Sequence, residues 1–247
     1  MHRAIKRKIG VGGTKMDQKL DQIHKPNLII NGVSSAGGGD YDKVKIDGVG
    51  TINGHLNAAV FHTNGITKVY GNLQADEMDC DGMIKIDGHL SAGKSVVDGT
   101  LKVKGSVRSD HFTVNGLLRV EGDCEVETME IAGSFEVNGL LNAGRMNANL
   151  HWKSQAKEIG VEFIKVRRVS KSSWSKLWRW MLPKAVPGLK AEVIEGDDID
   201  LEYTEADIVR GNRIRIGKGC SIGRVEYRTE LNVIPGAKIG EEVKTGD

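Results

Sequence analysis

Glycine recurs in this chain with a fixed period, and that period limits what the chain can fold into. Paired glycines stand at positions 48 and 54, 65 and 71, 82 and 88, 99 and 105, 116 and 122, and 133 and 139. The steps alternate between 6 and 11, which gives a 17-residue unit that is repeated six times. An unbroken period of this length is typical of a solenoid, in which each repeat stacks on its neighbours.

Apolar residues within the unit come in pairs two positions apart, which is strand periodicity. Counted from Lys43, the pairs fall at positions two and four, eight and ten, and fourteen and sixteen. Position two, for example, holds Val44, Phe61, Met78, Ser95, Phe112 and Met129, and position fourteen holds Leu56, Leu73, Leu90, Val107, Cys124 and Leu141. Three short strands per turn predict a triangular coil, with successive coils about 4.8 Å apart. We therefore predict an all-β, three-sided parallel β-helix.

The glycines mark the corners of this coil. A polar residue often precedes them, as in Asp47-Gly48 and Asn53-Gly54. Glycine adopts positive φ without penalty, and Asx side chains bond locally to the backbone. Such pairs often indicate hairpins, but three strand pairs in an unbroken 17-residue period favour a coil.

The run KVKIDGVGTINGHLNAAVFHTNGITKVYGNLQAD and its continuation to Leu150 resemble the bactofilins, bacterial polymer-forming cytoskeletal proteins. The resemblance covers roughly residues 28 to 150 and rests on the columns and their spacing. It implies a right-handed β-helix that assembles into filaments without nucleotide. The C-terminal part resembles longer bactofilin-like proteins of spore-forming bacteria, which implies a link to motility or the cell envelope.

Four regions follow from these patterns: a flexible basic tail over 1–27, the β-helix over 28–150, a Trp-rich basic insert over 151–190, and a C-terminal β-helical segment over 191–247. Residues 1–15 carry five basic and no acidic side chains, and Met16 offers a second plausible start, so translation of 1–15 stays open. Leu28 to Gly39 is expected to form a cap coil and then a flexible glycine hinge.

The C-terminal segment repeats the strand pattern of the first. Ile214/Ile216 are paired at two, and Leu231/Val233 repeat this pair one period later. This predicts further β-helix there. Whether it continues the first axis or forms a second short solenoid stays open.

The insert has the most distinctive chemistry outside the repeat. Ten basic residues face two acidic ones over 151–190, and eight acidic residues with no Lys or Arg follow over 192–207. Trp174, Trp178 and Trp180 interleave with Lys and Arg, which suits a membrane interface. Alternatively, a short helix here covers the solenoid. We expect membrane contact through these three tryptophans.

An enzymatic alternative comes from IRIGKGCSIG, which resembles the hexapeptide-repeat acyltransferases, left-handed coils that act as trimers with a histidine as general base. Only His55 and His89 share a column, which is expected to be an outward, solvated ladder. Cys80, Cys124 and Cys220 fall on inward positions and are expected in the core. No Walker loop or C-x-x-C pair occurs. We expect no enzyme activity, cofactor, metal, nucleotide or nucleic acid.

The two ends of a solenoid expose unpaired backbone groups and core side chains, so they favour association with another copy. We therefore predict a homopolymer, a structural scaffold of filaments joined end to end. The expected contacts lie in the first coil and the last regular one: Leu28, Ile30, Val44, Ile46, Phe135, Val137, Leu141 and Met146. No segment approaches the roughly 20 apolar residues of a transmembrane helix, and a cytoplasmic location, at the inner face of the membrane, is expected.

Overall fold

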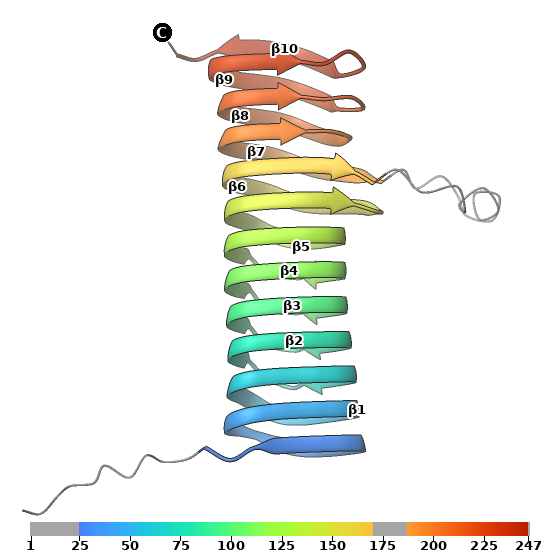
Figure 1. Cartoon of the computed structure of the whole chain (residues 1–247). Coiled ribbons are helices and arrows are strands. Elements are labelled where there is room, and N and C mark those ends of the chain that lie inside the picture. Colours follow the sequence, from blue (N-terminus) through green and yellow to red (C-terminus); the bar gives the residue numbers. More distant parts are fainter. Residues whose placement is uncertain (1–24, 170–186, 247) are drawn as a thin grey trace, which may run out of the picture.

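The computed structural model describes residues 25–169 and 187–246, and these form one stack of parallel strands (Figure 1). Ten strands follow each other in sheet order as they do in sequence. They are β1 (Leu28–Val69), β2 (Leu73–Ile86), β3 (Leu90–Val103), β4 (Val107–Val120), β5 (Cys124–Leu150), β6 (Lys153–Arg168), β7 (Gly188–Leu201), β8 (Thr204–Ile216), β9 (Ser221–Val233) and β10 (Lys238–Lys244). Each long strand bends around the corners of the triangular coil, so a single strand covers more than one side.

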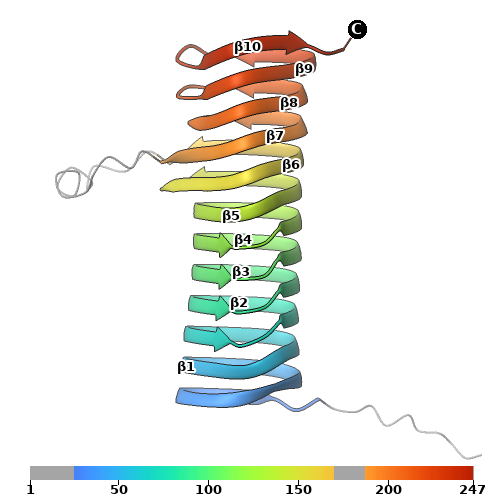
Figure 2. The same cartoon turned by 180° about the vertical axis from the view of Figure 1, so that it is seen from behind.

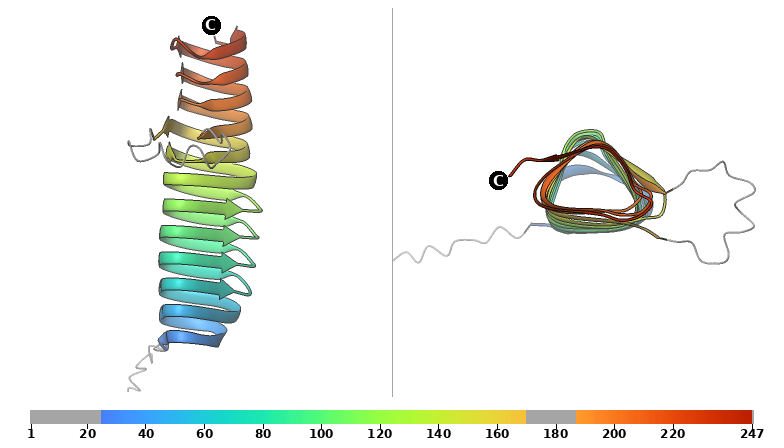
Figure 3. Two further views of the ribbon diagram at one scale, coloured as in Figure 1. Left: turned by 90° about the vertical axis from the view of Figure 1, so that its right-hand side faces the viewer. Right: turned by 90° about the horizontal axis from the view of Figure 1, so that it is seen from above.

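The stack is a right-handed solenoid with a triangular cross-section. The chain runs from left to right along the near side while it rises, both in Figure 1 and from behind in Figure 2. The view along the axis in Figure 3 shows three sides of similar length. The predicted all-β, three-sided β-helix is confirmed, and the left-handed coil implied by the hexapeptide resemblance is not what the chain forms.

The predicted columns form the core. Partners in β1–β5 are separated by one period of the repeat, as in Leu56 with Leu73 and Val97 with Val114. All members of positions two and fourteen are buried, and the largest fully buried side chains include Phe61, Phe112 and Phe135. Strand periodicity sends these side chains inward and their neighbours outward, so the coils bury one continuous column of apolar contacts.

The glycine at position six of the unit is required by a close approach between coils. Gly99 has φ of 143°, and a Cβ built there would lie 2.1 Å from the carbonyl oxygen of Gly82. The glycine at position twelve is crowded in the same way: a Cβ on Gly88 would lie 2.6 Å from the carbonyl carbon of Gly71. Both corners therefore exclude side chains, which explains the alternation of 6 and 11.

The expected glycine hinge after the cap coil is not present. Residues 28 to 69 form the single strand β1. A Cβ on Gly38 would lie 2.2 Å from the carbonyl oxygen of His55. The glycine there permits tight stacking on the next coil, and the prediction of a flexible hinge was wrong.

The C-terminal β-helical segment continues the first axis. β6 lies within the region 151–190 and pairs with β5 on one side and β7 on the other. The coil length changes here: partners are 18 apart at Leu141 and Ile159, 15 apart at Ile194 and Val209, and 17 apart again at Ile222 and Ile239. The solenoid therefore absorbs coils of different length without breaking its sheet.

Candidate interaction surfaces

The N-terminal end of the solenoid has an open core. Of residues 25–43, Ile30 alone is fully buried, at 4% exposure, while Leu28, Ala36 and Tyr41 are half-buried against the core. The first coil pairs with the coil above it, and within the described residues nothing pairs with its lower edge. Leu28 and Ile30 therefore lie where the sequence predicted an end.

The C-terminal end is open in the same way. The last fully buried side chain is Val225, and no residue from 226 to 246 is fully buried. Leu231, Ala237 and Ile239 are half-buried, and Val233 is 41% exposed. β10 pairs with β9 alone among the described strands. Within the part of the chain that the structure describes, both ends thus present apolar side chains beside a row of backbone groups without a strand partner.

Several of the predicted contact residues lie elsewhere. Val44 and Ile46 are completely buried in the second coil. Phe135, Val137, Leu141 and Met146 lie in β5, between β4 and β6, and are at most 1% exposed. These four do not lie at an end, because the coils continue to β10 and the break in the glycine period at 150 does not terminate the stack.

The predicted membrane-contact residues Trp174, Trp178 and Trp180 lie outside the described residues. The chain departs toward them at Val169 and returns at Pro187. The described tryptophan, Trp152, is 52% exposed. It follows His151, whose N–H donates to the carbonyl oxygen of Gly133, so it lies beside the corner marked by the position-six glycines.

The column of His55 and His89 is a hydrogen-bonded ladder. The His55 Nδ1 accepts from the N–H of Asn72, the Asn72 Oδ1 from the N–H of His89, and the His89 Nδ1 from the N–H of Ser106. Ser106 and Asp123 extend the ladder to Leu140. The predicted outward ladder is therefore present, and its bonds to the backbone are a feature that sequence reasoning missed. Both Nδ1 atoms are occupied in holding coils together.

The cysteines are core residues, as predicted. Cys80 and Cys124 are fully buried, and burial raises the pKa of each thiol to about 12, with Asp81 and Asp79 adding to the effect at Cys80. Burial also raises the pKa of Cys220. All three are free thiols. A thiol of this kind is a poor nucleophile at neutral pH.

The three sides of the five regular coils between residues 43 and 127 differ in charge. We call them the first face (43–47, 60–64, 77–81, 94–98 and 111–115), the second face (49–53, 66–70, 83–87, 100–104 and 117–121) and the third face (55–59, 72–76, 89–93, 106–110 and 123–127). The first face carries three cations and five anions, the second five cations and two anions, and the third one cation and five anions. The second face alone is positive.

Exposed apolar side chains of these coils gather on the same face. The large hydrophobic residues that are exposed between 43 and 127 are Val49, Ile66, Tyr70 and Met83. All four belong to the second face. Val49, Ile66 and Met83 occupy the same column on successive coils, because the register pairs Ile66 with Met83. They stand next to Lys68 and Lys85.

Ion pairs between coils concentrate in β6–β9. Arg213 binds Asp198 through two nitrogens, each 2.5 Å from a carboxylate oxygen. Asp200 lies between Arg167 and Arg215. Hydrogen bonding to Arg213 lowers the pKa of Asp198. Burial opposes ionisation of Asp200, but its bonds to Arg167 and Arg215 outweigh that effect and lower its pKa.

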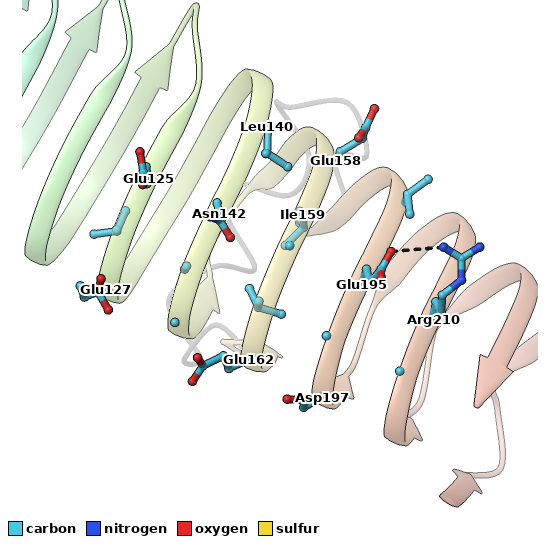
Figure 4. Close-up of a pocket in the computed structure, with 18 of the residues that line it drawn as sticks. Glu125, Glu127, Leu140, Asn142, Glu158, Ile159, Glu162, Glu195, Asp197 and Arg210 are labelled. Atoms are coloured by element: carbon cyan, nitrogen blue, oxygen red, sulfur yellow. Dashed lines mark hydrogen bonds and ion pairs between the residues drawn. The ribbon is translucent and has the colours of Figure 1, made fainter. Parts of the chain in front are cut away.

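An open groove of about 650 Å³ begins on the third face, at Arg108 in β4 and Glu125 in β5, and continues along the later coils as far as β9 (Figure 4). Glu127, Glu162 and Asp197 line one side, and Glu195 pairs with Arg210 at 3.2 Å on the other. Among residues 25–169 and 187–246, no three His, Cys, Asp or Glu side chains are grouped to hold a metal ion. The groove is therefore an open, polar surface groove with charged side chains along both of its sides. In the same ranges, no helix is long and apolar enough to span a bilayer.

Comparison with known proteins gives two relatives, both from Bacillus subtilis (strain 168). The uncharacterized protein YhbE is 48% identical over 243 residues, which covers 91% of this chain and 100% of the relative. The chain belongs to the YhbE family. The uncharacterized protein YhbF is 40% identical over 107 residues, and the match spans 43% of this chain and 42% of YhbF. No family model and no solved structure matches the chain.

Proposed function

We propose that this protein is a structural scaffold, not an enzyme, that assembles end to end into nucleotide-independent filaments of the bactofilin kind. The observation that carries the proposal is that both terminal coils are open. Leu28 and Tyr41 at one end, and Leu231 and Val233 at the other, leave apolar area in water that a second copy would cover.

The edges of the sheet support the same contact. β10 has one partner among the described strands, and so has the first coil of β1. A row of free N–H and C=O groups on an edge strand is a template for pairing with another chain. When β10 of one copy meets β1 of the next, the parallel stack continues. Such a contact joins two different surfaces and does not close, so it propagates as a filament.

The filament would lie at the inner face of the cell membrane in the cytoplasm, with Trp174, Trp178 and Trp180 as a membrane contact. Interleaved indoles and cations suit the headgroup region of a bilayer. A scaffold at this location would serve motility or the cell envelope. These parts of the proposal rest on the resemblance to bactofilins and on the composition of the insert.

Electron microscopy of purified protein tests the proposal, with two matched variants. Val233→Lys places a charge at the C-terminal end, where the side chain is 41% exposed. Leu140→Lys makes the same change on the side of the stack, where the side chain is 43% exposed. We expect filaments from the natural protein and from Leu140→Lys. Val233→Lys should shorten or abolish them, because an unpaired charge would be buried at each joint.

Two outcomes would contradict the proposal. The first is a natural protein that stays monomeric at high concentration in sedimentation velocity and forms no filament. The second is equal polymerisation of both lysine variants, which would mean that the ends do not carry the contact. Circular dichroism of each variant verifies that the coil itself is unchanged.

A further inference from the structure

We propose that the second face, defined above by the outward strands between residues 49 and 121, binds an anionic lipid bilayer, so that the solenoid lies with its axis along the membrane. The inference deepens and rests on the membrane contact of the proposed function, and is independent of filament formation. It assigns to folded coils a contact that the sequence predicted for the insert alone.

The second face differs from the other two in its charge. The second face has a net charge of +3, from five cations and two anions, whereas the first face has −2 and the third −4. Its cations stand on successive coils, because the register pairs Lys68 with Lys85, Lys85 with Lys102 and Lys102 with Arg119. Stacked coils put these groups about 5 Å apart along the axis. An anionic surface would relieve this column of like charges, and Lys and Arg near such a surface are attracted to it.

Three of these five cations have a carboxylate partner and two do not, among the described residues. Asp87 is shared by Lys85, at 3.7 Å, and Lys104, at 3.1 Å. The Arg119 guanidinium binds Glu136 at 2.7 Å. Lys68 and Lys102 have no carboxylate within 4 Å in the described part of the chain; the Lys68 ammonium lies 3.8 Å above the Tyr70 ring. Within residues 25–169 and 187–246, the face therefore keeps positive charge at Lys68 and Lys102 that no carboxylate neutralises.

An exposed apolar column lies beside these cations on the second face. Ile66 is 53% exposed, Met83 42% and Val49 40%, on three successive coils. Tyr70 is 48% exposed on the other side of Lys68. Apolar side chains beside lysines match the boundary between acyl chains and headgroups, where lysine stems lie along apolar surface and their charges reach the phosphates.

The residues at which the chain leaves the stack toward Trp174, Trp178 and Trp180 lie close to the second face. The chain leaves the coil at Val169, which is 37% exposed and whose N–H donates to the carbonyl oxygen of Leu150, two residues before the 52% exposed Trp152. Residue 151 bonds to Gly133, in the same glycine column that precedes Val49, Ile66 and Met83 at the corner of the second face. Val169, the last described residue before Trp174, Trp178 and Trp180, therefore lies at the corner that borders the second face.

A second copy of the chain is the other candidate for a positive face. The third face, at −4, complements it in charge. However, within the same coils the third face has no large hydrophobic side chain that is exposed, so Ile66 and Met83 would be covered by polar groups. The apolar column therefore favours a bilayer.

Vesicle flotation of the full chain tests the proposal, with vesicles of phosphatidylglycerol and phosphatidylcholine compared with pure phosphatidylcholine. The test variant is the triple change Lys68→Gln, Lys85→Gln and Lys102→Gln. Its matched control is Lys43→Gln, Lys45→Gln and Lys94→Gln, which removes three lysines from the first face. Since each lysine near an anionic surface strengthens binding several-fold, we expect the test variant to bind anionic vesicles at least roughly tenfold more weakly. The control should bind as the natural protein does.

An apolar variant gives a second, independent readout. Ile66→Ser with Met83→Ser changes exposed side chains and leaves every lysine in place. We expect weaker binding to anionic vesicles at high salt, where charge attraction is screened. Equal loss of vesicle binding in the two triple-lysine variants would show that binding depends on net charge alone. Unchanged binding in the test variant would show that the second face does not contact the vesicle. Either result overturns the proposal.

The same samples separate this inference from the proposed function. A Trp174→Ala, Trp178→Ala and Trp180→Ala variant that loses all binding, while the second-face triple keeps it, would leave the insert as the membrane contact and overturn the second face. Filaments imaged without vesicles report on the scaffold independently. If the second-face triple instead changes self-association in the absence of lipid, with vesicle binding intact, the face is a contact between copies and the proposal fails.

Discussion

At the corner between the first and second faces, each position-six glycine lies against the carbonyl oxygen of the glycine one coil below. The φ values there run from 120° at Gly48 to 159° at Gly133. Such backbone angles exclude most side chains, and the stacking distance excludes a Cβ. The corner is therefore the most restricted part of the repeat.

We predict that Gly99→Ala destabilises the protein by about 1–3 kcal/mol or more, since a strained backbone angle costs that much before any clash. A Cβ there would also lie 2.1 Å from the Gly82 oxygen. Gly37→Ala is the control, because a Cβ on Gly37 has nothing within 4 Å. Thermal melts followed by circular dichroism should show a lower Tm for the first variant alone; equal melts would contradict the steric argument.

The buried thiols give a second prediction at this scale. Burial raises the pKa of Cys80 and Cys124 to about 12, so both thiols stay protonated at pH 8, and neither is exposed to solvent. We expect no alkylation by iodoacetamide in the native protein and complete labelling of the three cysteines in guanidinium chloride. Mass spectrometry measures both. Rapid native labelling would mean that the coils open locally.

At the scale of elements, β6, β7 and β8 are joined by the Arg167–Asp200–Arg215 ladder as well as by their backbones. Asp200 is 26% exposed and Arg167 24%, so this pair is more enclosed than Arg108 with Glu125, whose side chains are 73% and 56% exposed. An enclosed pair is less screened by water. Loss of the Asp200 carboxylate leaves Arg167 with Glu202, at 3.9 Å, and removes the one carboxylate that pairs with Arg215 among the described residues.

Asp200→Asn should therefore destabilise β6–β8 by roughly 1–3 kcal/mol, while Glu125→Gln changes stability by about 1 kcal/mol or less. Each coil contacts only its neighbours, so hydrogen exchange should quicken in β6–β8 and stay unchanged in β2 and β3. A uniform change along the stack would contradict a local role for the ladder.

The pH dependence follows from the same carboxylate. The pKa of Asp200 is lowered in the folded state, so its ionised form is favoured there and its stabilisation is complete above the usual value of 3.8. That stabilisation is lost as the pH falls through the lowered pKa. The Tm difference between the natural protein and Asp200→Asn, measured from pH 7 to pH 2, should shrink below pH 4. A constant difference would exclude ionisation of Asp200 as its source.

The sequence predicts the regular coils well and the later ones less well, for a physical reason. Between Lys43 and Gly144 every coil has the same length and the same two glycine corners, so periodicity alone places Phe61 and Phe112 in the core. Beyond Gly144 the coil length changes. Paired residues of β7 and β8 are 15 positions apart in the sequence, so a search for a 17-residue period does not detect this pairing.

The candidate surfaces were less accessible to sequence reasoning than the fold. The glycine period ends at Leu150, but the stack of coils continues to β10. A coil whose corner has no glycine looks like an interruption when only the sequence is considered. The predicted contacts at Leu28 and Ile30 do lie at an end. The charge difference between faces is already present in the columns of the sequence repeat. It can be recognised as a positive surface only when the strand register shows that Lys68 stacks on Lys85.

At the scale of the whole molecule, one continuous sheet runs past the Trp-rich segment. Leu150 pairs with Arg168, and Lys153 pairs with Gly188. Residues 151 and 152 connect Leu150 to Lys153, whereas one coil later the chain has 19 residues, 169–187, between the equivalent positions Arg168 and Gly188. The coil thus needs two residues there, and the remainder of the segment is not required to complete the stack.

We therefore predict that replacing residues 169–187 by Asn-Gly leaves the solenoid intact. The backbone pairs on both sides keep their register, so the β-sheet circular dichroism signal should be unchanged and the Tm should stay within a few degrees. Because neither end of the stack is altered, filaments should also form. Loss of the folded signal would show that the segment supports the coils, which would favour the interpretation that its tryptophans cover the solenoid. With the fold retained, vesicle binding by this variant measures what the second face contributes without the tryptophans.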